Sequence, residues 1–219
     1  IGDEGAILSY LEKGEVKRRL FSPTADAKST ETFKELFAEY PDAPIYLLVD
    51  MVEQSYVRQT LPPVTSFGVN KIIQRRLARD FAPDDLKGAL PLGREKSGRK
   101  DWNVLLIALA YKDTLRDWCE LIYDLPNRFM GVYLSPVESE GIVRLLNAIF
   151  DSGASKSSRS KRKFSLPTLT PSNKVVMEAS QMRWDILVVH NKTGGFRQVV
   201  LKNGALVFTR MAESTGEEK

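Results

Sequence analysis

Carboxylate side chains are the most chemically suggestive groups in this 219-residue sequence, because several lie where predicted strands begin or end. Asp50 ends the largely apolar run at residues 45–50 and Glu53 follows it, and the active sites of open α/β sheets gather at such strand ends. Asp3 and Asp101 lie at other strand boundaries, and a two-metal nuclease would need several such carboxylates to converge. This spacing is common by chance, however, and a helix-capping role explains Asp50 more simply. We therefore predict no catalytic residue and no metal site.

The single cysteine and the single histidine limit nucleophilic and acid–base chemistry. Cys119 lies in an apolar helical segment with no histidine nearby in the sequence, which predicts a buried core thiol rather than a nucleophile. One cysteine cannot form an intramolecular disulfide, and this indicates a reducing compartment. His190 has no second histidine as a partner. Glycine-rich phosphate loops of the Walker type, nucleophile elbows and sets of zinc ligands are absent from the sequence.

Basic side chains cluster at three places in a chain whose net charge is +4. One cluster lies on a predicted helix, one in a predicted loop, and one in a Ser-rich run at residues 156–163. Such patches attract phosphate backbones or anionic lipids. No aromatic residue is interleaved with residues 156–163 to stack on bases, so a solvated surface is the simpler interpretation. The helix and loop residues that we predict to contact a partner are Arg75, Arg76, Arg79, Arg94, Lys96, Arg99 and Lys100.

The elements that position these residues alternate between strands and helices over the first 150 residues. Continuous apolar runs at residues 45–50 and 101–111 predict buried strands, the first of them parallel. Further strands are predicted at residues 6–10, 16–21, 56–61 and 130–135, and helices at 30–40, 69–81, 113–123 and 136–150. We expect Ile142, Leu145, Leu146 and Ile149 to face the core from the last helix, and Trp102, Trp118 and Trp184 to be core anchors. The alternation predicts an α/β protein with a mixed sheet flanked by helices.

A change in composition divides the sequence after residue 150. Residues 151–173 are rich in Ser, Lys, Arg and Pro, which predicts a linker or a long loop. Three strands are predicted after it, at residues 184–190, 196–202 and 205–211, the last two joined by the tight turn at Asn203 and Gly204. This meander echoes the β-hairpin at the start of the chain.

This organisation resembles the actin-like, ribonuclease H-type ATPase fold, in which two related halves each begin with a meander. It is most similar to the cytoplasmic actin-like domains of bacterial assembly-platform proteins, among them the type II secretion L component and the type IV pilus M component. The resemblance lies in residues 45–81, which include IYLLVDMVEQSYVRQTLPPV and KIIQRRLARDF, and in residues 194–210 (GGFRQVVLKNGALVFTR). It implies a first actin-like subdomain at residues 1–150 and the start of a second, incomplete one at 174–219.

The resemblance also implies where a nucleotide would bind. In actin-like ATPases the first turn of each half carries an aspartate that holds Mg²⁺ and glycines that let N–H groups approach the phosphates. Ala6 replaces the expected hydroxyl residue, and His190 stands near the second aspartate position although Mg²⁺ prefers oxygen ligands. We therefore expect an ordinary turn role for Asp3, a partly buried strand-end ring for His190, and no cofactor. The residues that would bind Mg-ATP in the alternative case are Asp3, Gly5, Lys192, Thr193, Gly194 and Gly195.

A non-catalytic scaffold is the function that the resemblance implies. The domain would lie in the cytoplasm at the inner-membrane face, attached through regions outside this sequence, and would bind assembly components such as a hexameric motor ATPase. No stretch of the sequence approaches the ~20 apolar residues of a membrane span. An active actin-like ATPase and a nucleic-acid-binding protein are the alternatives, and association of the chain with itself stays open.

Overall fold

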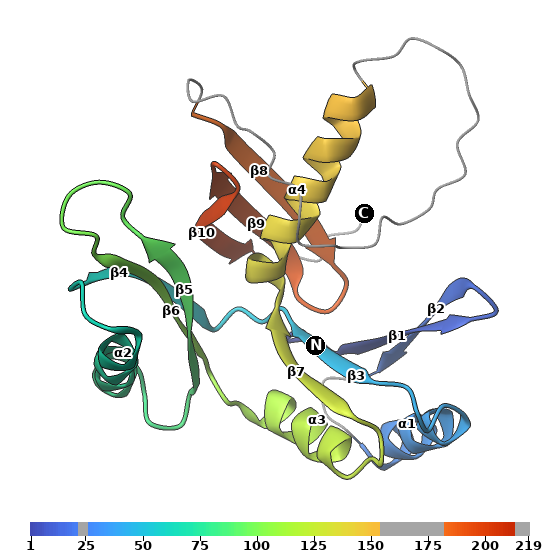
Figure 1. Cartoon of the computed structure of the whole chain (residues 1–219). Coiled ribbons are helices and arrows are strands. Elements are labelled where there is room, and N and C mark those ends of the chain that lie inside the picture. The colour runs from blue at the N-terminus through green and yellow to red at the C-terminus, as the bar shows by residue number, and fades with distance from the viewer. Residues whose placement is uncertain (22–25, 154–181, 213–219) are drawn as a thin grey trace. The chain divides into compact units, whose positions relative to one another are not determined.

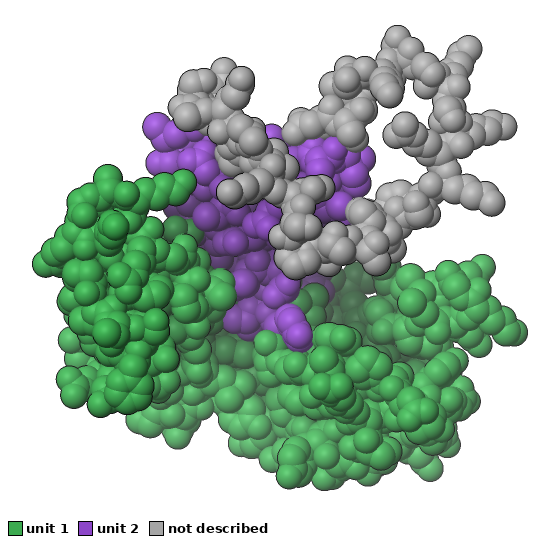
Figure 2. Space-filling model, viewed as in Figure 1, with its two compact units in different colours: residues 1–132, 192–194 green, residues 133–191, 195–219 purple. Residues whose placement is uncertain are grey.

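The structure is a computed structural model that describes residues 1–21, 26–153 and 182–212 (Figure 1). It divides into two compact units, residues 1–132 with 192–194 and residues 133–191 with 195–219 (Figure 2). The subdomain bounds predicted from the sequence, 1–150 and 174–219, come from a family resemblance and not from an analysis of compact units. They stay a prediction. The predicted linker lies outside the described residues from residue 154 onward.

A β-hairpin opens the first unit, as the sequence predicts. Strands β1 (Ala6–Glu12) and β2 (Glu15–Phe21) pair antiparallel in a continuous register from Ala6 opposite Phe21 to Glu12 opposite Glu15. Lys13 and Gly14 form the two-residue turn, with φ of 51° and 82°. Positive φ at both turn residues matches the right-handed twist of the flanking strands, which is why glycine is favoured there.

An aromatic cluster holds the hairpin's end to helices α1 (Ala27–Glu39) and α3 (Asp113–Tyr123). The ring of Phe21 lies 5.8 Å from that of Phe33 and 5.6 Å from that of Trp118, both edge-on. Trp118 is only 1% exposed, so its predicted role as a core anchor is confirmed. Edge-to-face contacts of this kind add to the burial of apolar area in holding a core together.

Strand β3 (Ile45–Val49) pairs with β7 (Phe129–Leu134) in a two-stranded sheet. Its side chains alternate between buried and exposed positions: Ile45, Leu47 and Val49 are buried, whereas Tyr46 and Leu48 are 58% and 49% exposed. The prediction of a buried strand is therefore right for one face of β3 and wrong for the other. An uninterrupted apolar run fits burial on both faces, but the fold covers only one face here.

A three-stranded antiparallel sheet with the order β4-β6-β5 carries helix α2 (Ser66–Asp80) on one face. Its strands are β4 (Gln54–Leu61), β5 (Leu86–Arg94) and β6 (Trp102–Leu109). The sequence predicts β4, β6 and α2, although β5 was not expected. Thr65 precedes the helix, and its side chain accepts a hydrogen bond from the Gly68 N–H and so caps the first turn. The buried residues between helix and sheet are Leu61, Val69, Ile73, Leu77, Val104 and Leu106.

The second unit is a meander with a helix on one face. Strands β8 (Trp184–Asn191), β9 (Gly195–Lys202) and β10 (Ala205–Ala212) form an antiparallel sheet with β9 in the centre, as predicted. Helix α4 (Ser135–Gly153) contacts all three strands. The sheet residues Val199, Leu201 and Leu206 are at most 2% exposed.

The predicted inward face of α4 is wrong in most of its positions. Ile142, Leu146 and Ile149 are 51%, 37% and 44% exposed, Leu145 is partly buried, and Val143 is the buried apolar residue of this stretch. The apolar residues of α4 form a stripe wider than the face that the sheet covers. Helical periodicity therefore identified the element without identifying the side that is covered.

Candidate functional site

The two glycine-bearing turns that the sequence singles out contact each other directly in the first unit. Gly2 and Gly5 form an isolated antiparallel bridge, in which the Gly2 N–H donates to the Gly5 carbonyl over 2.9 Å. The Glu4 N–H between them donates to the carbonyl oxygen of Thr193 over 2.8 Å. Thr193 is 2% exposed, and residues 192–194 belong to the same compact unit as the N-terminal turn. The first turn therefore has one of its backbone donors bound to the second turn.

The two turns approach so closely that only glycine fits at their contact. A Cβ atom at Gly2 would lie 2.2 Å from the Thr193 carbonyl oxygen and 2.7 Å from its Oγ1. Gly5 has a φ of 155°, and a Cβ there would lie 2.5 Å from the Phe21 carbonyl oxygen. These distances are shorter than any non-bonded contact that a carbon atom tolerates. Glycine at positions 2 and 5 therefore leaves room for the carbonyl groups of Thr193 and Phe21.

Asp3 is held by the segment that follows β3. Its Oδ2 accepts a hydrogen bond from the Val52 N–H over 2.8 Å, and the nearby Asp50 N–H donates to the Ile1 carbonyl over 2.8 Å. A carboxylate that accepts from a backbone N–H satisfies a donor that would otherwise lack a partner. In this arrangement Asp3 orders its own turn and residues 50–52.

An ion pair lies near Asp3, between two exposed side chains. Lys112 Nζ lies 2.6 Å from Glu53 Oε1, and the Ala110 N–H donates to the Glu53 carbonyl over 3.2 Å. The hydrogen bond to Glu53 raises the pKa of Lys112, and the charges of Glu53 and Asp3 add to this effect. The lysine is therefore cationic at neutral pH and already bound to a carboxylate.

In this arrangement one backbone donor of the two turns is not available to a nucleotide phosphate. A phosphate would need free N–H groups, but the Glu4 N–H is bonded to Thr193. Lys192 is exposed, whereas Gly194 and Gly195 are buried, and Gly195 has a φ of 92°. Across the described parts of the chain, no three or more His, Cys, Asp or Glu side chains group in a way that could hold a metal ion. Nor does any described helix have the length and apolar character to cross a membrane.

His190 differs from the expectation of a partly buried ring. It is exposed at the end of β8, and its ring stacks on that of Phe196 with centroids 4.6 Å apart. The two residues are directly opposite each other in the register of β8 and β9. The imidazole therefore pairs with an aromatic neighbour across the strands rather than entering the core.

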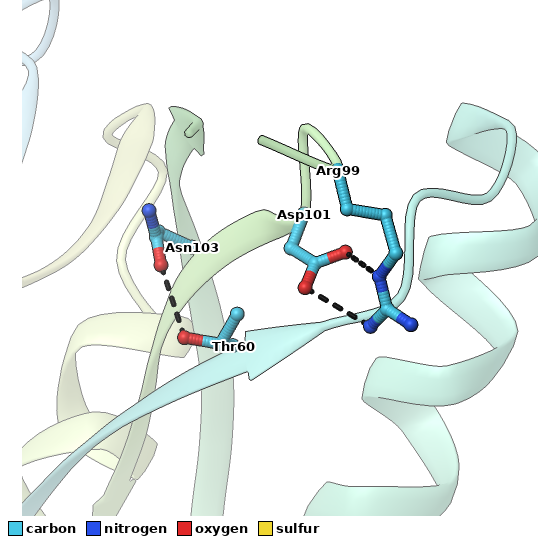
Figure 3. Close-up of polar contacts among 4 residues, drawn as sticks. All are labelled: Thr60, Arg99, Asp101 and Asn103. Atoms are coloured by element: carbon cyan, nitrogen blue, oxygen red, sulfur yellow. Dashed lines mark hydrogen bonds and ion pairs between the residues drawn. The ribbon is translucent and has the colours of Figure 1, made fainter. Parts of the chain in front are cut away.

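The predicted contact residues divide into those that bind within the chain and those that extend into solvent. Arg99 donates to both oxygens of Asp101 over 2.8 and 3.0 Å, beside the Thr60–Asn103 hydrogen bond between β4 and β6 (Figure 3). The guanidinium of Arg94 lies 4.3 Å above the Trp102 ring. These pairs leave less free charge at the base of the loop than the sequence suggests.

Helix α2 contributes the rest of the predicted contact residues. Arg79 Nε lies 2.6 Å from Asp80 Oδ1, and Arg76 is partly buried. The exposed side chains of this set that form no ion pair with another described residue are Arg75, Arg94, Lys96 and Lys100, of which Arg94 lies over the Trp102 ring.

The sequence interpretation missed an aromatic residue at the start of this helix. Phe67 is 71% exposed, and Lys71 Nζ lies 4.6 Å from the centre of its ring. The missed signal is the capping residue Thr65, because a helix placed from residue 69 onward leaves Phe67 in a loop. With Lys71 and Arg75, one turn apart, Phe67 makes the exposed side of α2 both basic and aromatic, which we call the α2 surface.

Comparison with known proteins shows a similarity of fold. No protein-family model and no curated protein match the chain. Among solved structures, a chain of a "PilM-PilN type IV pilus biogenesis complex" is similar with a TM-score of 0.61 and 12% sequence identity, over 99% of this chain and 60% of that one. At this identity the likeness shows the fold. The predicted actin-like α/β fold with flanking helices is confirmed, and its described strands form four separate sheets rather than one mixed sheet.

Proposed function

We propose that this chain is a non-catalytic scaffold domain of a type IV pilus-type assembly machine. The observation that carries the proposal is the hydrogen bond from the Glu4 N–H to the Thr193 carbonyl, which joins the two turns. The fold, shared with a chain of the PilM–PilN complex, supplies the class of machine. In an actin-like fold these turns are the phosphate-binding elements, so their direct contact favours a structural role over nucleotide chemistry.

A protein partner is the ligand that such a domain would bind. The similar structure is a complex of PilM with PilN, and we propose that this chain likewise joins another component of its assembly platform. The α2 surface, with Lys96 and Lys100 of the loop between β5 and β6, offers cationic side chains without ion pairs to described residues. Complementary charge raises association rates and excludes unsuitable partners. An acidic face of a motor ATPase at the cytoplasmic side of the inner membrane would fit it.

Nucleotide titration tests the non-catalytic part of this proposal. We expect no heat and no thermal stabilisation when Mg-ATP or Mg-ADP is added to the purified chain at millimolar concentration. A ligand that binds only the folded state at 100 times its Kd would stabilise it by about 2.7 kcal/mol, so binding would be plain. Stabilisation that disappears in Asp3→Ala would instead establish the ATPase alternative.

Pull-down experiments test the partner-binding part. A PilN-type protein and a motor ATPase from the same assembly system would be tested at low and at physiological salt. We expect capture that weakens in Arg75→Glu combined with Lys96→Glu, because both substitutions reverse an exposed charge. Arg18→Glu combined with Arg19→Glu in β2 is the matched control, since it makes the same change of charge at two other exposed sites. Failure of every assembly component to bind would contradict the scaffold role.

A further inference from the structure

The sheet of the second unit has one face covered by α4 and one face that carries large exposed apolar side chains and that no helix of the described residues covers. The covered face carries Val199, Leu201 and Leu206, and Asn147 of α4 donates to Asp185 there. Side chains alternate between the faces of a strand, so the even-numbered residues of β8 and β9 lie on the opposite face. We call that opposite surface the bare sheet face.

Apolar side chains run across all three strands of the bare sheet face. In the central row, the register places Ile186 opposite Val200 and Val200 opposite Phe208. Ile186 is 72% exposed and Phe208 is 52% exposed. Trp184 and Val188, two residues to either side of Ile186, are 54% and 57% exposed. Contiguous apolar patches of this kind on a soluble surface mark sites of interaction.

Among the described residues of this face, the charged side chains are all basic. Lys202 is opposite Trp184, and its Nζ lies 5.1 Å from the centre of the indole ring. Arg210 is exposed in the row of Gln198 and Val188. None of the rows on this face contains a carboxylate, because Asp185 lies on the α4 side. A ligand that covers the face therefore meets an apolar centre and a cationic rim.

We propose that the bare sheet face binds an amphipathic α-helix of a partner protein whose apolar stripe is flanked by acidic residues. Three strands spaced about 4.8 Å apart present a surface about 10 Å wide, which matches the diameter of a helix. The opposite face already packs against the helix α4 in this way. A second copy of this chain is a poorer occupant, because two such faces would bring their basic rims together. This proposal does not depend on the nucleotide question or on the α2 surface.

The indole of Trp184 provides a direct readout, because it is exposed on the proposed site whereas Trp118 is buried. The probes are two synthetic helical peptides with the same leucine stripe, one flanked by glutamates and the other by lysines. We expect the glutamate peptide to bind the full chain saturably and to shift the Trp184 emission to shorter wavelength. The lysine peptide should bind at least about tenfold more weakly, a difference of about 1.4 kcal/mol.

Two substitutions of equal chemistry locate the site. Ile186→Asp should weaken the glutamate peptide at least about tenfold, since a carboxylate would stand in the apolar centre and face an acidic ligand. Ile142→Asp on the exposed side of α4 should leave binding unchanged, although Ile142 is 51% exposed in the same unit. Circular dichroism would confirm that both variants are folded.

Several results would overturn the proposal. Equal affinity for the two peptides would show that acidic flanks are not required. Equal loss of affinity in the Ile186→Asp and Ile142→Asp variants would show that the peptide does not bind on the bare sheet face. Self-association that Ile186→Asp abolishes, measured by sedimentation, would assign the face to a second copy of this chain. A Trp184 shift on vesicles of anionic phospholipid, with none on the peptide, would assign it to a membrane surface.

Discussion

At the scale of single residues, Gly2 and Thr193 carry most of what the structure says about function. They lie at opposite ends of the sequence, yet an added Cβ at Gly2 would reach within 2.2 Å of the Thr193 carbonyl oxygen. The sequence identified both glycine-bearing turns as sites of close approach. The sequence does not show which group lies beside each glycine, because a glycine next to a phosphate and a glycine next to a peptide carbonyl look the same in a sequence. In the structure, the peptide carbonyl of Thr193 lies beside Gly2.

Gly2→Ala should therefore destabilise the protein by about 1–3 kcal/mol, as expected when an added methyl group has no space. Urea unfolding followed by circular dichroism would measure the loss. Gly141→Ala in α4 is the matched control, because no atom lies within 4 Å of its added Cβ. In a helix that change should be neutral or stabilising by up to about 1 kcal/mol. Equal stability of both variants would refute the turn contact.

Cys119 should react slowly with alkylating reagents. The side chain is partly buried, and burial, followed by the charge of Glu120, raises the pKa of its thiol. Since the thiolate is the reactive form, the iodoacetamide rate at pH 8 should be lower than that of free cysteine, whose pKa is about 8.5. The rate should still be rising above that pH. A rate that levels off below pH 8 would show an activated thiol instead.

At the scale of elements, local patterns predicted the hairpin, the meander and the helices, with ends within a few residues. Strand β5 was missed because Gly88, Pro91 and Gly93 are poor strand formers. The strand exists because β6 offers it a partner along its length, with a bulge between Pro91 and Gly93. Tertiary pairing overrides weak propensity in this case.

The local patterns were less informative about which faces are covered. Trp184 was expected to anchor a core, yet it is 54% exposed on the bare sheet face. The exposed stripe of α4 and the exposed side of β3 are errors of the same kind. Apolar periodicity shows which residues could be buried together, but the covering element has to come from elsewhere in the fold. Exposed apolar faces on correctly predicted elements are therefore informative about binding.

Substitutions in the core between α2 and its sheet should lower the stability of the first unit more than substitutions at its surface. Leu106 is fully buried in that cluster, so Leu106→Ala should lower the free energy of unfolding by about 2–5 kcal/mol. Leu90→Ala in β5 makes the same change at a residue that is 37% exposed, and it should cost clearly less. Thermal unfolding of both variants would compare them. A smaller loss for Leu106→Ala than for Leu90→Ala would contradict the assignment of this core.

At the scale of the whole molecule, the resemblance found in the sequence gave the actin-like fold, and the structural neighbour confirms it. The resemblance did not predict where residues 192–194 belong. This turn connects β8 and β9 of the second unit, but it is part of the first compact unit. A hairpin is predicted from its own residues. The compact unit to which the turn belongs depends instead on its contact with the N-terminal turn, almost two hundred residues earlier in the sequence.

The net charge of +4 should produce only weak binding to nucleic acid. Arg79, Arg94 and Arg99 already interact with side chains of this chain, which reduces the charge available to phosphates. Any retention of duplex DNA at about 50 mM salt should therefore be lost by about 150 mM. Electrophoretic mobility shifts over this range would measure it. Sequence-selective binding at physiological salt would restore the nucleic-acid alternative.

The contact between Glu4 and Thr193 also sets an order of events during synthesis on the ribosome. All of the first unit except residues 192–194 has been translated by residue 132, and about 60 further residues must follow before the turn exists. At 5–20 residues per second this interval lasts about 3–12 s, far longer than a hairpin needs to form. During this interval the Glu4 N–H of the N-terminal turn lacks its Thr193 partner. A chaperone could bind the exposed turn at this stage.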